Sequence, residues 1–330
     1  MTSLTKRNSN AFIIGEVGSN WKRDISPIIN YQNCIKFIEA AKEAKCDAVK
    51  FQLFTHKELY GYEGQEGSDA YSLPKEWIPN LKHVCDQVGI EFMCTAFSEE
   101  GYDYVDRFVN YHKIASSENS HDKLINQIEK YKKVTFISLG GVNHKKFPFI
   151  VGYQKRNSLL IPMACIVEYP ALPEQYHLSY LSGYNNFGLS DHTMDFELAI
   201  MAIGMGSRFF EKHFDIFGDD KIQSPDSPHS INLNDLKNYV NKIKKFTAIA
   251  EDQLDEYIEQ ESKRKYRRRI KAIKDIYPGD ILVYGSNFGV YRSKEDDLHA
   301  ASGEVVYKFM NKISTKRKQI GEGLFYTDIE

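Results

Sequence analysis

The sequence predicts a (β/α)8 barrel followed by a small, mostly β domain. From residue 11 to about residue 246, short runs rich in β-branched and aromatic residues alternate with longer segments of helical period. Eight such strand and helix units fit into this stretch, as a (β/α)8 barrel requires. A strongly charged segment follows, and after it come short strands separated by turn residues.

The eight expected strands are short apolar runs. In chain order they are Phe12–Glu16, Ala48–Leu53, Glu91–Thr95, Tyr111–Ala115, Val134–Ser138, Leu159–Cys165, Phe187–Ser190 and Arg208–His213. Helices are expected between them, with examples at 31–44, 74–88, 195–204 and 234–248. Pro74 suits a first helical turn, where its missing N–H is not needed, and Asn234 with Asp235 suits a capped helix start.

Composition divides the chain into a barrel domain at residues 1–248, a linker at 249–266 and a second domain at 267–330. The basic run Lys263–Arg269 could suggest binding of phosphate or nucleic acid. The acidic stretch before it balances its charge, so a solvated connector is the favoured interpretation. Beyond it, the turn signal Tyr277–Asp280 is typical of a small domain made of short strands.

Overall charge excludes two classes of partner. The chain has 330 residues with 43 basic and 45 acidic side chains, a formal net charge of −2. This balance gives no electrostatic reason to expect binding to nucleic acid or to an anionic membrane. The polar start Met1–Asn10 runs into an apolar stretch too short for a signal peptide, and no run approaches the roughly 18 apolar residues of a membrane span. We therefore expect a cytoplasmic protein that acts on small molecules.

The five cysteines are scattered and include no Cys-x-x-Cys pair. They are Cys34, Cys46, Cys85, Cys94 and Cys165. An odd number without a paired spacing indicates reduced residues in the protein core, so none is assigned a catalytic role.

Polar side chains end almost every expected strand. They are Glu16, Lys50 with Gln52, Thr95, Lys113 with Ser116 and Glu118, Ser138, Ser190 with His192, and His213. The C-terminal ends of barrel strands meet at one rim, where the active sites of these barrels lie. So many ionisable and hydroxyl groups converging on one rim predict a functional site.

Two lysines in this set favour an anionic ligand. Lys50 and Lys113 lie in otherwise apolar strands, where an ammonium group is costly without an anionic partner. An ion pair between Lys50 and Glu16 is one explanation. The other is a ligand with phosphate and carboxylate groups, held by both lysines with Ser116 and Ser138 and approached by backbone amides of the Gly140-Gly141 loop.

Two histidines in the set could hold one divalent metal. His192 and His213 each follow a short apolar run and lie about twenty residues apart. This spacing matches no compact zinc motif, so a satisfied polar histidine at a strand end is the alternative for each.

Eight sequence blocks share their order and spacing with one enzyme family over essentially the whole barrel. They are Gly15–Asn20, Val49–Gln52, Cys94–Ser98, His112–Glu118, Tyr169-Pro170, Gly188–Thr193, Glu211–Phe214 and Ser224–Asp226. In these blocks the chain resembles the sialic acid synthase family. Its segments Arg268–Leu282 and Thr327–Glu330 resemble the antifreeze-like (SAF) domain that follows the barrel in that family.

The resemblance implies an activity. Members of this family condense phosphoenolpyruvate with an N-acetylated aldose, which gives a nine-carbon 2-keto-3-deoxy sugar acid and releases phosphate. His192 and His213 match the metal ligands, usually for Mn²⁺, with Mg²⁺ or Co²⁺ as other choices. The metal would polarise the sugar aldehyde.

The resemblance also assigns the remaining site residues. The positions that match phosphoenolpyruvate binding are Lys50, Thr95, Lys113, Ser116, Ser138 and Ser190. The positions around the sugar and the metal-bound water are Glu16, Glu118, Tyr169 and Asp226, of which the three carboxylates are the catalytic candidates. Arg292 matches an arginine that reaches into the partner subunit's site, which implies a domain-swapped homodimer.

The chain departs from the family at three places. Trp21 stands where a histidine near the sugar is common, and Ile166 with Val167 replace a small polar residue that touches phosphoenolpyruvate. Ser224 replaces the glycine of Gly-Pro-Asp. Because the metal and lysine positions are kept, the pattern predicts the same chemistry with a different acceptor sugar.

Two other functions are consistent with the sequence. A metal-dependent pyruvate aldolase would need the histidines but not Lys50, Lys113, Ser116 and Ser138, and it would release no phosphate. A sugar-binding or regulatory protein without activity is supported by Trp21 and Val167 and opposed by the retained histidines.

Overall fold

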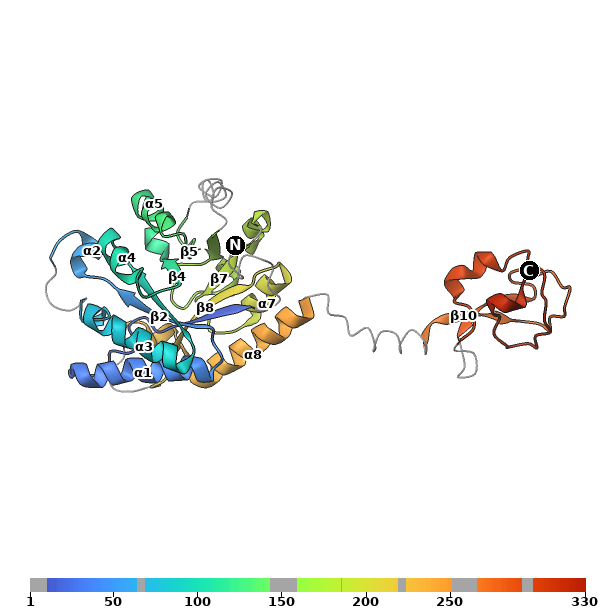
Figure 1. Cartoon of the computed structure of the whole chain (residues 1–330), viewed down its shortest axis with the longest axis horizontal. Helices are drawn as coiled ribbons and strands as arrows, with labels where there is room; N and C mark the ends of the chain where they lie inside the picture. The colour runs from blue at the N-terminus through green and yellow to red at the C-terminus, as the bar shows by residue number, and fades with distance from the viewer. Residues whose placement is uncertain are drawn as a thin grey trace. The chain divides into compact units, whose positions relative to one another are not determined.

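The computed structural model describes residues 11–63, 69–142, 159–184, 186–218, 224–250, 266–292 and 299–330. The chain forms two compact units, Met1–Glu251 and Asp252–Glu330 (Figure 1). Most of the linker expected at 249–266 lies outside the described residues. Among the helices that are described, none combines the length and the apolar character needed to cross a bilayer.

Eight parallel strands form the centre of the larger unit. They are β1 (Phe12–Glu16), β2 (Ala48–Leu53), β3 (Glu91–Ala96), β4 (Tyr111–Ile114), β5 (Val134–Ser138), β6 (Leu160–Ala164), β7 (Gly188–Asp191) and β8 (Phe209–Asp215). Their order is β3-β2-β1-β8-β7-β6-β5-β4, and the end strands β3 and β4 contact each other. The sheet therefore curls into a near-closed barrel, which confirms the predicted fold class.

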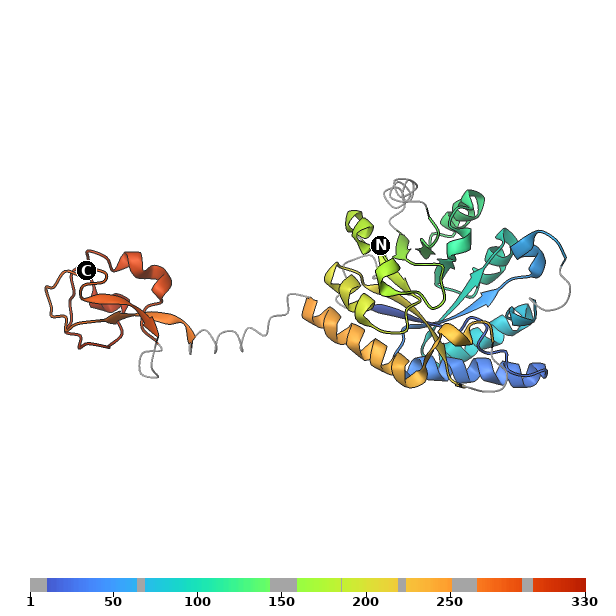
Figure 2. The same cartoon turned by 180° about the vertical axis from the view of Figure 1, so that it is seen from behind.

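Helices surround the strands (Figures 1 and 2). They are α1 (Pro27–Glu43), α2 (His56–Tyr60), α3 (Ile78–Val88), α4 (Glu99–Val105), α5 (Asp122–Lys130), α7 (Glu197–Gly204) and α8 (Leu233–Ala250). A short strand, β9 (Ile231–Asn232), pairs with the end of β8 and leads directly into α8.

One expected helix start is wrong, and another is displaced by one residue. Pro74 does not lie in the first turn of an α-helix, because a 3₁₀ turn at Lys75–Trp77 intervenes and α3 begins only at Ile78. The start of α8 is capped by Asn232, whose side-chain oxygen accepts a hydrogen bond from the Asp235 amide at 3.0 Å. The cap lies before Asn234 because β9 runs straight into the helix.

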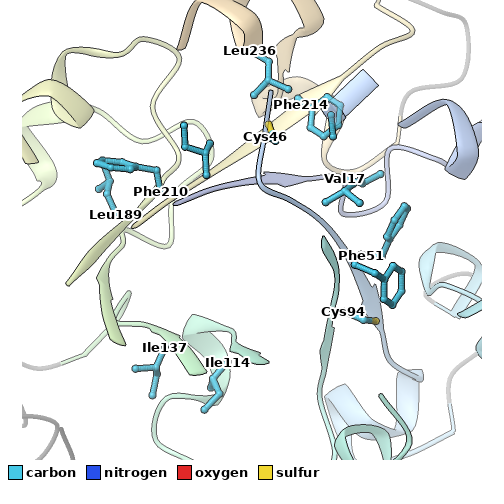
Figure 3. Packing of buried hydrophobic residues seen from close by; sticks show 14 of the residues in the cluster. Val17, Cys46, Phe51, Cys94, Ile114, Ile137, Leu189, Phe210, Phe214 and Leu236 are labelled. Atoms are coloured by element: carbon cyan, nitrogen blue, oxygen red, sulfur yellow. The ribbon is translucent and has the colours of Figure 1, made fainter. Parts of the chain in front are cut away.

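Alternation along the strands creates two apolar layers. Ile13 and Phe51 belong to the large cluster between strands and helices, and Figure 3 shows residues of this cluster pointing outward from the ring of strands. Phe12 and Ile14 belong to a second cluster, which fills the lower interior of the barrel. Because side chains alternate along a strand, Glu16 follows Phe12 and Ile14 on the inner face.

The same rule applies around the barrel. Inward apolar residues near each strand start are followed, two or four residues later, by inward polar residues near its end. The inner polar layer consists of Glu16, Lys50, Gln52, Thr95, Lys113, Ser138, Ser190, Glu211 and His213. Strand periodicity thus places the polar residues at one rim above an apolar floor.

The smaller unit is built around one antiparallel pair of strands. β10 (Arg268–Ala272) pairs with β11 (Phe288–Arg292), and 3₁₀ turns lie at Gly303–Lys308 and Tyr326–Asp328. Its core is apolar and includes Ile270, Ala272, Ile276, Leu282, Phe288, Ala301, Phe309 and Leu324. This is the small domain of short strands that the sequence predicts.

Candidate active site

A pocket opens at the C-terminal rim of the barrel strands, where the active sites of such barrels lie. Its lining residues are Glu16, Lys50, Gln52, Thr95, Phe97, Lys113, Ala115, Ser116, Ser138, Cys165, Tyr169, Ser190, His192, Glu211 and His213. The structure therefore brings most of the sequence-predicted residues to one place.

Four buried charges share the pocket floor. Lys50 Nζ lies 2.7 Å from Glu16 Oε2, so the ion pair considered for Lys50 is formed. Glu211 lies between the two lysines, 3.8 Å from Lys50 Nζ and 3.6 Å from Lys113 Nζ. All four side chains are at least nine-tenths buried, and the two positive charges balance the two negative ones.

The two carboxylates differ in their protonation. Burial raises the pKa of Glu16 to about 7, although the nearby Lys50 opposes the shift. Burial acts in the same direction on Glu211, but Lys113 and Lys50 outweigh it and lower the pKa of Glu211 to about 2. Glu16 can therefore exchange a proton near neutral pH, whereas Glu211 stays ionised.

Hydroxyl groups flank both ammonium groups. Lys50 Nζ donates to Thr95 Oγ1 at 3.0 Å, and Lys113 Nζ donates to Ser138 Oγ at 2.7 Å. Burial, together with the charge of Lys50, lowers the pKa of Lys113, although Glu211 opposes the shift. An anionic ligand would reduce this cost, because it would add a second negative charge near an ammonium group that is removed from water.

The wall beside Lys113 is formed by close backbone contacts. Ser116 Oγ accepts a hydrogen bond from the Gly140 amide at 3.2 Å. A Cβ atom at Gly140 would lie 2.5 Å from Val167 Cγ2 and 2.7 Å from Ser116 Oγ. Only glycine fits this position, so Val167, one of the departures from the family pattern, rests on the predicted glycine loop.

Aromatic rings line the other side of the pocket. Tyr169 stacks on His192 with ring centroids 4.1 Å apart and packs on His229 at 4.4 Å. His192 Nδ1 is hydrogen-bonded to the Ile166 carbonyl at 2.7 Å, so this nitrogen carries a proton, and Nε2 lies 3.8 Å from Cys165 Sγ. The His192 and His213 ring centroids are 5.6 Å apart.

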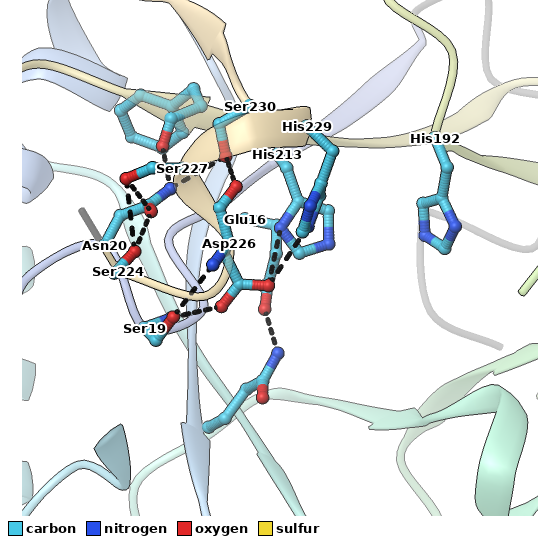
Figure 4. Close-up of polar contacts among 12 residues, drawn as sticks. Glu16, Ser19, Asn20, His192, His213, Ser224, Asp226, Ser227, His229 and Ser230 are labelled. Atoms are coloured by element: carbon cyan, nitrogen blue, oxygen red, sulfur yellow. Dashed lines mark hydrogen bonds and ion pairs between the residues drawn. The ribbon is translucent and has the colours of Figure 1, made fainter. Parts of the chain in front are cut away.

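A histidine and carboxylate cluster lies next to His213 (Figure 4). Asp226 Oδ1 lies 3.8 Å from His213 Nδ1 and 3.2 Å from His229 Nε2. The ligand atoms of these three residues all lie within 4.8 Å of one another. Burial lowers the pKa of His213 to about 3, so its imidazole is neutral at physiological pH.

These residues fit a divalent cation. Within the described part of the chain, the buried Nδ1 atom of His213 has no hydrogen-bond partner. Neutral imidazole and carboxylate are common ligands of divalent transition metals. An ion between His213 and Asp226 would satisfy this nitrogen, and the cluster can therefore hold a metal.

A polar network fixes the segment that carries Asp226. Ser19 donates to Asp226 Oδ2 through its backbone amide at 2.7 Å, and Asn20 Nδ2 donates to Ser230 Oγ at 2.8 Å. Arg23 is hydrogen-bonded to Ser227 Oγ at 2.6 Å and forms a buried ion pair with Asp215 at the end of β8. The loop after β1 and the end of β8 thus position Asp226.

Three predicted residues are not part of the pocket lining. Glu118 lies in the 3₁₀ turn after β4, with its carboxylate 3.7 Å from His121 Nδ1. Asp226 lies behind His213 in the cluster just described. Arg292 is exposed at the end of β11 in the smaller unit.

Trp21 is a buried residue of the loop after β1. It is 2% exposed and packs edge-on against Trp77, with ring centroids 5.6 Å apart, in the core between strands and helices. Its indole therefore belongs to the core and is not part of the pocket lining. The loop after β1 turns Ser19 and Asn20 toward the rim and Trp21 toward the core.

Sequence reasoning missed Glu211 and His229. Glu211 lies between the apolar Phe209 and the predicted ligand His213 on β8, and inward alternation along this strand is the signal that could have identified it. His229 belongs to a short turn after β8, where no periodic pattern applies. The tertiary fold places this turn so that His229 contacts Asp226, and the sequence alone does not show this contact.

Comparison with known proteins finds similarity to sugar acid synthases. The pseudaminic acid synthase of Campylobacter jejuni is 29% identical over 297 residues, which cover 82% of this chain and 84% of that protein. The N,N'-diacetyllegionaminic acid synthase of Legionella pneumophila is 29% identical over 261 residues, or 71% of each chain.

Solved structures share the fold. The N-acetylneuraminic acid synthetase of Leptospira borgpetersenii has a TM-score of 0.66 at 24% identity, and the match covers 78% of this chain and 92% of that one. Spore coat polysaccharide biosynthesis protein SpsE of Bacillus subtilis has a TM-score of 0.62 at 23% identity over 97% and 95% of the two chains. The NeuB family model matches residues 37–254, more than half of the sequence, and the chain therefore belongs to the NeuB family.

Proposed function

We propose that this protein is a nonulosonic acid synthase, which condenses phosphoenolpyruvate with an N-acetylated aldose to a nine-carbon 2-keto-3-deoxy sugar acid and releases phosphate. The observation that carries the proposal is the pair of buried ammonium groups, Lys50 and Lys113, at the rim of the barrel beside a histidine and carboxylate cluster. The synthase relatives in pseudaminic and legionaminic acid formation support this reaction class.

Phosphoenolpyruvate would occupy the floor of the pocket. Its phosphate and carboxylate groups would pair with Lys50 and Lys113, which Thr95 and Ser138 already contact. Ser116 and Ser190 also line this floor. Fixed ammonium and hydroxyl donors would hold these anionic groups and stabilise oxygen atoms that gain charge during the reaction.

The acceptor sugar would lie toward the aromatic wall, where Tyr169 lines the pocket. Carbon 3 of phosphoenolpyruvate attacks the aldehyde carbon, water adds at carbon 2, and phosphate leaves from the tetrahedral intermediate. A divalent cation, for which we propose Mn²⁺ held by His192 and His213, would supply polarisation of the aldehyde oxygen when bound. Mg²⁺ and Co²⁺ are alternative ions for the same ligands.

Acid and base roles fall to the carboxylates. Glu16 is suited to move a proton to or from the reacting oxygen atoms or the attacking water, because its pKa is raised to about 7 by burial and it lies in the pocket floor. For Asp226 we propose a role beside the cation site, because its Oδ1 atom lies 3.8 Å from His213 Nδ1. For Glu118 we propose a role at the sugar, although it lies beside the pocket rather than in its lining.

The proposal extends to the organisation of the protein. We infer that residues 1–248 are the catalytic domain, that 249–266 are a linker and that 267–330 are an antifreeze-like domain. We further infer a cytoplasmic homodimer in which Arg292 contacts the sugar in the partner's site.

The test is a screen of N-acetylated hexoses with phosphoenolpyruvate and Mn²⁺, read by phosphate release and product mass. We expect one acceptor to yield equal amounts of phosphate and of a product heavier by a pyruvate unit. A condensation that uses pyruvate and releases no phosphate would identify the aldolase instead. Metal-loaded protein without turnover on any acceptor would contradict the proposal.

A further inference from the structure

His229 contacts the candidate metal cluster but has no role in the reaction proposed above. It lies in the 3₁₀ turn Ser227–His229, and the residue is 7% exposed. Its Nε2 atom is 3.2 Å from Asp226 Oδ1, and its ring centroid is 5.1 Å from that of His213. This contact is a hydrogen bond between an imidazole and a carboxylate, and both groups are common ligands of divalent metals.

The spacing of the three groups suits ligands of one ion. Ligand atoms about 2.1 Å from a metal and about 90° to 110° apart are separated by about 3.0 to 3.5 Å. Asp226 Oδ1 lies 3.2 Å from His229 Nε2 and 3.8 Å from His213 Nδ1. All three ligand atoms lie within 4.8 Å of one another, so local side-chain movement would let them bind one cation.

The surroundings hold these three groups in place. Asp226 Oδ2 is occupied by the Ser19 amide, which leaves Oδ1 directed at the two imidazoles. Tyr169 packs on the His229 ring, and the Asp226 carbonyl accepts a hydrogen bond from Ser230 Oγ at 2.7 Å. Outer contacts of this kind fix the orientation of metal ligands.

We propose that His229 is a ligand of the divalent cation, together with His213 and Asp226, so that the protein holds its metal before any substrate binds. Two histidines alone leave most positions around a cation to water and substrate, whereas three or more protein ligands retain it in the free protein. The inference rests on one part of the proposed function, namely that this rim binds a divalent cation.

The experiment is a Mn²⁺ titration of the whole, chelator-treated chain without substrates. Free Mn²⁺ is followed by its electron paramagnetic resonance signal, and pulsed resonance of the bound ion counts the coordinated imidazole nitrogens. We expect one ion per chain, with an affinity at least about tenfold lower in His229→Ala and one fewer coordinated imidazole. His83→Ala, which removes an exposed histidine on α3, should bind as the unmodified protein does.

A second variant guards against a folding defect. His229→Phe keeps a ring for Tyr169 to pack on but has no nitrogen, and it should lose the same imidazole signal. Unchanged affinity and imidazole count in a folded His229 variant would overturn the inference while leaving a metal-dependent synthase intact. If the unmodified chain binds no Mn²⁺, both the inference and the metal in the proposed function fail.

Discussion

Two buried carboxylates contact Lys50, but their pKa values shift in opposite directions. Glu211 contacts both ammonium groups and stays ionised, whereas Glu16 contacts only Lys50 and is shifted toward its protonated form by burial. Their effects on folding should therefore differ in sign. A group with a lowered pKa stabilises the fold above its unfolded pKa, and one with a raised pKa stabilises it below that value.

We predict that Glu16→Gln and Glu211→Gln change the pH dependence of thermal unfolding in separate windows. The contribution of Glu211 is lost as the pH falls from about 4.5 toward about 2, so its replacement flattens the profile there. The contribution of Glu16 to stability is lost as the pH rises from about 4.5 to about 7, so its replacement flattens the melting profile between these pH values. Melting temperatures measured from pH 3 to pH 8 test both.

The matched control is Glu43→Gln. This carboxylate pairs with Lys237 at 2.6 Å on the surface, where an ion pair contributes only about 0 to 1 kcal/mol. Removing Glu211 should instead cost about 3 to 5 kcal/mol at neutral pH, because two buried ammonium groups lose a partner. Equal losses from both substitutions would argue against the charge arrangement described for the pocket floor.

Lys113 provides a prediction about the substrate. Lys113→Met should raise the KM for phosphoenolpyruvate at least about tenfold and that for the sugar less, because a charged hydrogen bond contributes about 1.5 to 3 kcal/mol. Steady-state kinetics with either substrate varied separate the two effects. Lys237→Met on α8 is the control. If KM for phosphoenolpyruvate is unchanged even when Lys50 is also replaced, both lysines have a structural role.

At the scale of the element, strands were more predictable than helices. A barrel strand is buried on both faces, so its apolar run and its polar end are visible in sequence, and the predicted strands match within a few residues. The short helices α2, α4 and α5 contain five to nine residues, too few for a clear period. The sequence did not place Trp21 in the core, because a loop has no period that tells which side chain faces the core.

The loop after β1 offers a test of how backbone positions the metal cluster. Gly18 has a φ of +54°, and a Cβ atom there would lie 2.5 Å from Asp226 Oδ2. Gly18→Ala should displace the carboxylate and weaken Mn²⁺ binding at least about tenfold, in addition to about 1 to 2 kcal/mol of backbone strain.

Gly61→Ala separates these two effects. Gly61 ends α2 with a φ of +81° and has no neighbouring atom within 4 Å of an added Cβ, so only the strain applies. Thermal unfolding should show a similar loss in both variants, whereas Mn²⁺ binding should change only in Gly18→Ala. Equal Mn²⁺ affinity in the Gly18 and Gly61 variants would show that the position of the Asp226 carboxylate does not depend on its close approach to Gly18.

At the scale of the whole molecule, the sequence predicts a barrel followed by a small β domain. It does not predict whether these two domains contact each other. The barrel pocket brings lysines, carboxylates and histidines together, and the smaller unit has its own apolar core. The arrangement of two domains depends on contacts between their surfaces. The periodic sequence pattern of a single helix or strand does not encode these contacts. Arg292 is therefore the residue whose role most needs an experiment.

The geometry of the smaller unit gives a physical reason to test Arg292. It stands directly across the antiparallel pair from Arg268, and both side chains are exposed. Like charges at opposed positions disfavour strand pairing, so this end of the sheet would gain from a ligand or surface that accepts hydrogen bonds from a guanidinium.

We predict that Arg292 acts in trans, so that two inactive variants restore activity when mixed. Arg292→Ala should condense the substrates poorly, because moving the acceptor by about 1 Å can lower the rate roughly a hundredfold. His213→Ala should lose the step that depends on the metal. In a mixed dimer, the barrel of the Arg292 variant receives the arginine of its partner, so one of the two sites has every group intact. Phosphate release after subunit exchange is the measurement, with each variant alone as the control. If exchange is demonstrated by a labelled subunit and activity does not return, Arg292 acts within its own chain or has no part in the reaction.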